Sequence, residues 1–172
     1  MIERADTLNN QAIILASDGA YKEAIACFKR AIVIDKSNSL LWFNLGVTYR
    51  DGGDLEEAEK ALATAYKIAP DNGDIQETYA TTCLMQKKYA KTREICEESL
   101  DLNPLNAHLF NLLGVVEFQN ESYDEAAEWF EEAVYINPYY LDALYNLKDT
   151  YSQLKNRNGE IECDRKIKEL KN

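Results

Sequence analysis

Apolar and polar positions in this chain follow the period of amphipathic α-helices. In residues 39–72 apolar side chains recur every three or four positions in two stretches, separated by Asp51-Gly52-Gly53 and closed by Pro70. This spacing places the apolar side chains on one face of each stretch, and glycine and proline interrupt helices. The pattern therefore predicts two helices joined by a glycine turn and ended by proline.

The same helix pair recurs along the chain. Pro70, Pro104 and Pro138 are its only prolines and lie 34 residues apart, and the glycines Gly46 and Gly114 occupy equivalent places two periods apart. A fixed period of this length is typical of solenoids, in which each unit buries its apolar face on its neighbours. We expect one array with repeats at approximately 5–38, 39–72, 73–106, 107–140 and a degenerate, capping unit at 141–172.

The best-preserved unit matches a known repeat, and its matching residues are Trp42-x2-Leu45-Gly46-x2-Tyr49, then Ala58 and Pro70. This pattern resembles the tetratricopeptide repeat (TPR). The resemblance implies an all-α, right-handed superhelical solenoid of antiparallel helix pairs, with about ten helices. It also implies that the first helices of successive repeats line a concave groove, which takes up extended peptides or helices from partner proteins.

Two units depart from the pattern. In the third, Gln76 stands where the second has tryptophan, Thr92 replaces its alanine, and Gln86-Lys87 replaces the glycine turn. We expect this unit to be the softest link of the array. In the last, Lys148 occupies the small-residue position and the second helix keeps only a thin apolar stripe. Because terminal repeats must show a polar face to water, a cap is favoured over an array with further repeats downstream.

Composition narrows the class of partner. The formal net charge is −11, which argues against nucleic acid and favours basic or apolar partners, although simple solvation of the surface explains the charge as well. No apolar run approaches the ~20 residues that a membrane span needs. The first ten residues lack the pattern of a signal peptide, and the four cysteines form no CxxC pair or zinc-site spacing. We expect a cytoplasmic protein with reduced, buried cysteines, no membrane association and no nucleic-acid binding.

The TPR resemblance implies which repeat positions line the groove, and the residues at these positions are the candidates for partner binding. The candidates are Asn10, Phe43, Asn44, Val47, Arg50, Met85, His108, Asn111, Val115, Phe118, Tyr145 and Asn146. The apolar members among them are flanked by acidic residues, which suggests a partner with apolar anchors and basic flanks. The alternative is that some of these apolar side chains are packed between helices.

Two ligand modes can be compared with these residues. The clamp by which some TPR co-chaperones grip the acidic tail of heat-shock chaperones needs lysine, arginine and asparagine at set places. Only Asn44 matches that set, so we reject an acidic-tail ligand. The second mode is an asparagine ladder that binds a peptide backbone through amide groups. Asn10, Asn44 and Asn146 hold equivalent places, but the third and fourth units break the ladder and Asn111 is displaced by one. A purely structural hydrogen bond is the alternative.

Catalytic constellations are lacking in the sequence. His108 is the only histidine, no nucleophile can be assigned around it, and Asp51-Gly52-Gly53 is an acidic turn rather than a phosphate loop. We therefore expect no enzyme, no cofactor and no metal. The sequence favours a protein–protein interaction scaffold. The alternative is a structural module that oligomerises through the ends of the array, for which Tyr139-Tyr140 and the unusual last helix leave room.

Overall fold

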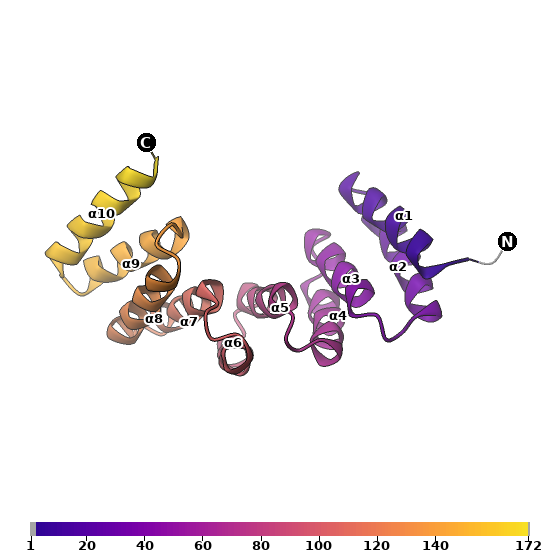
Figure 1. Cartoon of the computed structure of the whole chain (residues 1–172), viewed down its shortest axis with the longest axis horizontal. Helices are drawn as coiled ribbons and strands as arrows, with labels where there is room; N and C mark the ends of the chain where they lie inside the picture. Colours follow the sequence, from indigo (N-terminus) through magenta and orange to yellow (C-terminus); the bar gives the residue numbers. More distant parts are fainter. Residues whose placement is uncertain (1–2, 172) are drawn as a thin grey trace. The chain divides into compact units, whose positions relative to one another are not determined.

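In the computed structural model, residues 3–171 are described, and they form ten α-helices without a strand (Figure 1). The helices are α1 (Ala5–Ser17), α2 (Tyr21–Ile34), α3 (Ser39–Asp51), α4 (Leu55–Ile68), α5 (Gly73–Met85), α6 (Tyr89–Leu102), α7 (Ala107–Gln119), α8 (Tyr123–Ile136), α9 (Leu141–Gln153) and α10 (Arg157–Lys171). Each odd-numbered helix begins 34 residues after the previous one. The expectation of an all-α fold built from helix pairs is confirmed.

The helices group into two compact units. Unit 1 ends at Lys87 and contains α1–α5, and unit 2 begins at Lys88 and contains α6–α10. The boundary falls inside the third predicted repeat, between its two helices. The division of the chain into five repeats stays a prediction. No helix in residues 3–171 is both long enough and apolar enough to span a membrane.

Each helix pair turns through a residue with positive φ. These residues are Gly19 (78°), Gly53 (87°), Lys87 (58°), Glu121 (62°) and Lys155 (57°), spaced 34 residues apart. Glycine adopts this left-handed conformation without steric penalty, whereas lysine and glutamate do not. The turn geometry is therefore kept in all five pairs, although the glycine signal is lost in the last three.

Asparagines begin the odd helices of the middle pairs. The side-chain oxygen of Asn38 accepts a hydrogen bond from the Leu40 amide at 3.1 Å, and that of Asn72 accepts one from Ile75 at 3.1 Å. Asn106 caps α7 in the same way. Such caps satisfy backbone N–H groups that have no partner inside the helix.

Small residues let paired helices approach closely. A Cβ atom at Gly46 would lie 2.6 Å from Cγ of Leu62, and one at Gly114 would lie 2.5 Å from the ring of Phe130. Leu62 and Phe130 are 0% and 1% exposed, so both are fixed in the core. The absence of a side chain at Gly46 and Gly114 is therefore what allows this close approach.

The departure at Gln76 preserves a hydrogen bond. The indole nitrogen of Trp42 donates to the carbonyl oxygen of Lys36 at 3.0 Å. One repeat later, the amide nitrogen of Gln76 donates to the carbonyl oxygen of Pro70 at 2.7 Å. Gln76 is fully buried, and this bond offsets the desolvation of its amide. A side-chain N–H donor, rather than an aromatic ring, is what the two repeats share.

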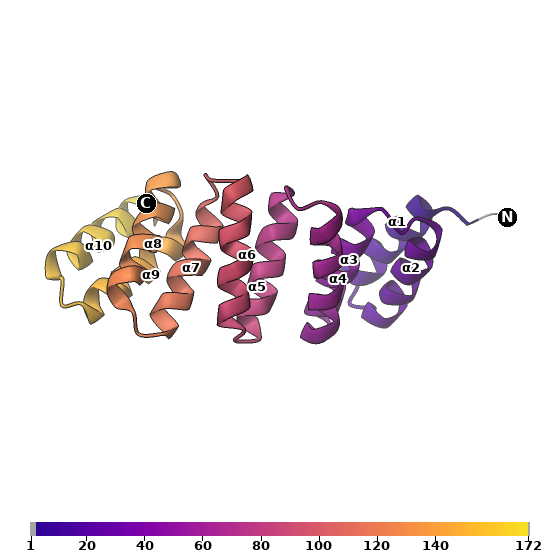
Figure 2. The ribbon, with the colours of Figure 1, turned by 90° about the horizontal axis from the view of Figure 1, so that it is seen from below.

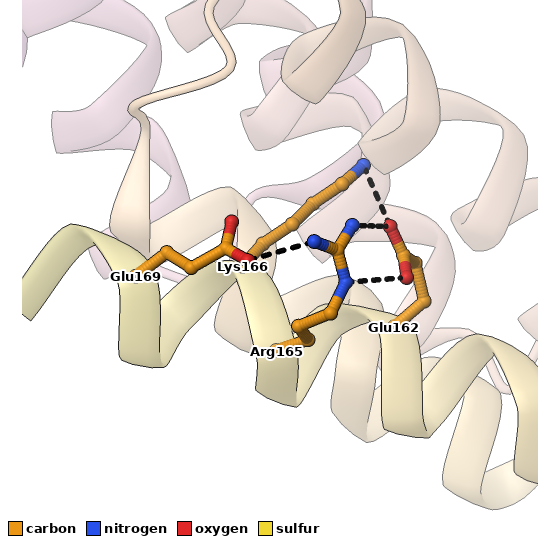
Figure 3. A network of polar contacts seen from close by, with 4 residues as sticks. All are labelled: Glu162, Arg165, Lys166 and Glu169. Carbon is orange, nitrogen blue, oxygen red and sulfur yellow. Dashed lines mark hydrogen bonds and ion pairs between the residues drawn. The ribbon is translucent and has the colours of Figure 1, made fainter.

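Charged pairs take over from apolar packing in the last helix pair. Lys148 and Asp164 stand where Gly114 and Phe130 stand in the preceding pair, and Nζ of Lys148 lies 2.8 Å from Oδ1 of Asp164. This contact raises the pKa of Lys148 and lowers that of Asp164. Along α10, a network of ion pairs between side chains three and four residues apart supports the polar helix (Figure 3).

Each unit has two distinct sides. Odd helices contact one another, α1 with α3, α3 with α5, and α7 with α9, whereas no such contact joins even helices within the described units (Figures 1 and 2). The odd-helix face of each unit is therefore the closer-packed side. On the even-helix side, a groove of about 360 Å³ lies between α2 and α4, and one of about 520 Å³ lies between α8 and α10.

Candidate functional site

A cavity of about 140 Å³ opens in unit 2 among α7, α8 and α9. It is lined by Val115, Phe118, Gln119, Phe130, Asn146 and Asp149. Three of these residues are predicted groove candidates: Val115, Phe118 and Asn146. The structure therefore brings together part of the set that repeat position nominated, and it adds Gln119 and Phe130, which sequence reasoning missed.

The apolar wall of this cavity is set by the packing of α7 on α8. Because Gly114 has no side chain, the ring of Phe130 reaches the α7 backbone and forms part of the cavity wall. The ring of Phe118 packs edge-on against Tyr123, with centroids 5.2 Å apart. Val115 and Phe118 are half-buried against the core of unit 2. They pack between helices and also face the cavity. Packing in the core and lining the candidate site are therefore compatible for these two residues.

A chain of polar contacts borders the cavity. Nδ2 of Asn146 donates to Oδ1 of Asn111 at 2.9 Å, and Nδ2 of Asn111 donates to the hydroxyl oxygen of Tyr140 at 3.3 Å. That hydroxyl oxygen lies 3.1 Å from Nδ1 of the exposed His108, and the two rings are 4.5 Å apart. These contacts fix the orientation of the Asn146 amide at the cavity. Tyr140 is a member of the chain that sequence reasoning did not place here.

Unit 1 repeats the amide pair. Nδ2 of Asn44 donates to Oδ1 of Asn9 at 3.0 Å, and the two residues are 35 positions apart, as are Asn111 and Asn146. The amides are thus paired between neighbouring odd helices, which is the structural hydrogen bond considered above. Asn10, the expected ladder member, is exposed. A peptide-binding role for these asparagines stays a prediction.

The remaining candidates of unit 1 lie on α3 and α5. Phe43 and Val47 are half-buried on α3, and Met85 on α5 is 54% exposed. Arg50 is engaged by its neighbour Asp51, with Nη2 at 2.9 Å from Oδ1. Its guanidinium is therefore already partnered within α3.

Acidic and aromatic groups flank the cavity on α9. Asp149 lines the cavity and is exposed. Tyr145, one turn away, is 37% exposed and has Nζ of Lys171 5.1 Å from its ring centroid, a cation–π distance. The cavity thus combines an apolar wall, the amides of Gln119 and Asn146, and one carboxylate. The described residues hold no cluster of His, Cys, Asp and Glu that could bind a metal ion.

The cysteines take no part in this site. Cys83 and Cys96 are 0% exposed and form no disulfide, as expected for small core residues. Cys163 is also free and is buried between α9 and α10. Burial raises the pKa of its thiol to about 11, which keeps it protonated.

Comparison with known protein families returns TPR models. The model described as the cytochrome c-type biogenesis protein H TPR domain matches residues 30–138, and a tetratricopeptide repeat model matches residues 5–38. Among curated relatives, human protein O-mannosyl-transferase TMTC3 is 27% identical over 88% of this chain and 19% of its own length. The matched region covers between 19% and 53% of the length of the curated relatives.

Solved structures with the same fold include two TPR proteins. MamA from Desulfovibrio magneticus superposes with a TM-score of 0.84 and 19% identity, covering 97% of this chain and 94% of its own. YrrB, described as a TPR protein with an unusual peptide-binding site, has a TM-score of 0.72 and 22% identity, covering 95% and 84%. At these identities the likeness concerns the fold. With a family model matching more than half of its length, this chain belongs to the tetratricopeptide repeat family, whose fold is typical of protein–protein interaction scaffolds.

Proposed function

We propose that this chain is a non-enzymatic scaffold that binds a segment of a partner protein on its odd-helix faces. The observation that carries the proposal is the cavity of unit 2, in which an apolar wall, two amides and a carboxylate converge. Its lining is divided between apolar and polar side chains, and placed polar groups beside an apolar wall can fix the orientation of a ligand. The candidates Phe43, Val47 and Met85 would form a second contact surface on unit 1.

The size of the cavity supports an aliphatic or small aromatic anchor. Apolar protein cavities of ~150 Å³ hold a benzene molecule. The cavity here is about 140 Å³, so one leucine-sized side chain fits between Val115 and Phe118. Burying such a side chain contributes about 1.5–3 kcal/mol. One anchor of this kind accounts for modest affinity, and flanking contacts must supply the rest.

The Asn146 amide supports recognition of the peptide backbone. Its Nδ2 donates to Asn111, while its side-chain oxygen Oδ1 accepts no hydrogen bond within the described part of the chain. An amide can accept from a peptide N–H and donate to a peptide C=O. Because Asn111 already holds this side chain, binding a peptide there loses little side-chain entropy.

Charge supports a basic flank next to the anchor. Asp149 borders the cavity and is exposed, and the whole chain carries a net charge of −11. A lysine or arginine one or two residues from the anchor would lie near this carboxylate. Long-range attraction of this sign raises the rate of encounter more than the final affinity.

The comparisons support binding rather than chemistry. YrrB, a structural neighbour, is described as having a peptide-binding site. The similarity to a transferase covers 19% of that protein, so no reaction is carried over to this chain. A cytoplasmic location and the absence of membrane and nucleic-acid partners remain predictions from composition.

A selection from a random peptide library displayed on phage tests the proposal with the full chain. Enriched peptides should share an apolar residue next to lysine or arginine. Synthetic versions should bind Phe118→Ala and Asp149→Lys at least tenfold more weakly than the wild type. The matched control is Glu132→Lys, because Glu132 is an exposed acid on α8 outside the cavity. No enrichment, or equal weakening by the control, would contradict the proposal.

A further inference from the structure

Packing of each even helix on the next odd helix is a repeated interface in this chain. It joins α2 with α3 and α4 with α5 in unit 1, and α6 with α7 and α8 with α9 in unit 2. One position on the odd helix is always covered by it. Thr48, Thr82, Val116 and Thr150 hold that position and are 0–3% exposed.

The outermost helices carry isoleucines at the corresponding positions. Ile14 of α1 holds the position of Thr48 and Val116, and it is 62% exposed. Ile161 of α10 is 55% exposed, whereas Ala127, which holds its position on α8, is 5% exposed. A single exposed isoleucine is ordinary. Two of them, each centred on a surface that is buried elsewhere in the chain, indicate that both surfaces are suited to being covered.

We propose that α10 of one copy of this chain packs against α1 of a second copy, as α8 packs against α9. Contacts inside the chain give the register. Nε2 of Gln86 on α5 donates to the Leu55 carbonyl at 3.2 Å and to Oε2 of Glu59 at 2.9 Å on α4. Shifted by multiples of the 34-residue period, Gln86 corresponds to Asp18, Leu55 to Arg157 and Glu59 to Ile161. Because Gln86 contacts the backbone of Leu55, this register places the second copy's Asp18, which follows α1, beside the first turn of α10 at Arg157.

A second internal contact gives the apolar part of the same register. Arg93 of α6 is paired with Glu117 of α7. Their equivalents by repeat position are Ile161 on α10 and Leu15 on α1. The interface therefore joins Ile161 to Leu15 and Ile14, and it brings Asp18 close enough for the Arg157 side chain to turn toward it. The side chain of Arg157 is 80% exposed, and Asp18 is exposed, so both are accessible to a partner.

The charges of α10 allow this contact. Arg165 holds the position of Glu131, whose Oε1 accepts a hydrogen bond from Tyr151 across the α8–α9 interface at 2.7 Å. In α10 the Arg165 guanidinium is held by two carboxylates, with Nη2 2.6 Å from Glu162 and Nη1 2.7 Å from Glu169 (Figure 3). If α1 of a second copy partly covers the Arg165 guanidinium, the two carboxylates still neutralise it, so no unpaired charge is buried.

The interface is heterologous, because it joins two different surfaces. Such contacts build open chains of copies rather than closed two-fold dimers. Thr7 and Gln11 on α1 stand where Leu41 and Leu45 stand on α3, so this surface is less apolar than its internal counterparts. We expect association that rises with protein concentration instead of a permanent oligomer.

Multi-angle light scattering of the full chain across a concentration range tests the proposal. The wild type should exceed the monomer mass of 19.7 kDa by twofold or more at high concentration. Ile14→Asp and Ile161→Asp should each remain monomeric. Leu105→Asp is the matched control, because Leu105 is 79% exposed and lies in the loop before α7, and this variant should associate like the wild type. Circular dichroism shows whether each variant is folded.

Mixing the two monomeric variants gives the sharpest outcome. Ile14→Asp keeps an intact α10, and Ile161→Asp keeps an intact α1. An equimolar mixture should therefore form a dimer that grows no further. A wild type that is monomeric at all concentrations overturns the proposal. So does a mixture that stays monomeric, or association that is lost in Ile161→Asp but kept in Ile14→Asp, since the latter indicates a symmetric contact.

Discussion

Gly46→Ala tests the packing of paired helices at its tightest point. The new Cβ would lie 2.6 Å from Cγ and 2.9 Å from Cδ2 of Leu62, and 3.3 Å from the carbonyl oxygen of Ala58. Carbon atoms in contact are normally about 3.5–4.0 Å apart. Leu62 is 0% exposed, so it must move by roughly 1 Å within a filled core, or α3 and α4 must separate.

The expected magnitude follows from two opposing effects. Overpacking of a core costs about 1–3 kcal/mol. Replacing glycine by alanine inside a helix contributes about 1 kcal/mol of stability. In the wild-type background, Gly46→Ala should therefore destabilise the fold by roughly 0–2 kcal/mol.

A double-mutant cycle separates the two effects. Leu62→Ala by itself should lower the free energy of unfolding by about 2–5 kcal/mol. In that background the clash with the Leu62 side chain is gone, and Gly46→Ala should stabilise by up to about 1 kcal/mol. The coupling energy between positions 46 and 62 is then about 1–3 kcal/mol.

Urea unfolding followed by circular dichroism measures the four chains of the cycle. Independent sites add to within about 0.3–0.5 kcal/mol. If Gly46→Ala has the same effect in both backgrounds within that margin, the close contact of α3 with α4 at this point is refuted.

Three further predictions concern turns and titrating groups. Glu121→Gly should stabilise the fold by about 1 kcal/mol in urea unfolding, because Glu121 adopts φ 62°, whereas Gly53→Ala should destabilise it by about as much. The Cys163 thiol has its pKa raised to about 11 from 9.0, so the unfolded chain loses this proton first, and stability should fall as pH rises from 9 to 11. That part of the fall should vanish in Cys163→Ala. The Asp164 carboxyl should titrate by NMR below its usual pKa, so its contribution to stability is lost as pH falls through that lowered value, and Lys148→Met should return the pKa to the ordinary range.

The helix pairs could be read from the sequence because their signals are local. Pro70 follows α4 by two residues, and Gly46 marks a close approach that requires a missing side chain. These features depend on spacing along one repeat, which the sequence displays directly. The turns at Lys87 and Glu121 could not be read in this way, because neither residue type favours positive φ.

The candidate site was only partly predictable because it depends on neighbours. Repeat position nominated Val115 and Phe118, but the share of each side chain that faces the cavity depends on how α7 packs against α8 and α9. The pairing of Asn111 with Asn146 joins two repeats, and a search within one repeat misses it. Asparagines spaced 35 apart, in both units, were the available signal.

The substitution at Gln76 shows a further limit. Judged by size and polarity it weakens the repeat, yet its buried amide makes the same hydrogen bond as the Trp42 indole, to the carbonyl oxygen six residues earlier. A pattern written in residue types does not express the donor that the two side chains share. Whether the third predicted repeat is softer than the others remains a prediction.

The central claim is that a partner segment binds at the cavity of unit 2. The most direct measurement is a two-dimensional NMR titration of the full chain with a peptide selected on it, following backbone amides and the side-chain amides of Asn111 and Asn146. We expect saturable shifts concentrated on these two side chains and on Val115 and Phe118. Shifts confined to the even-helix side, with the Asn146 amide unmoved, would contradict the account.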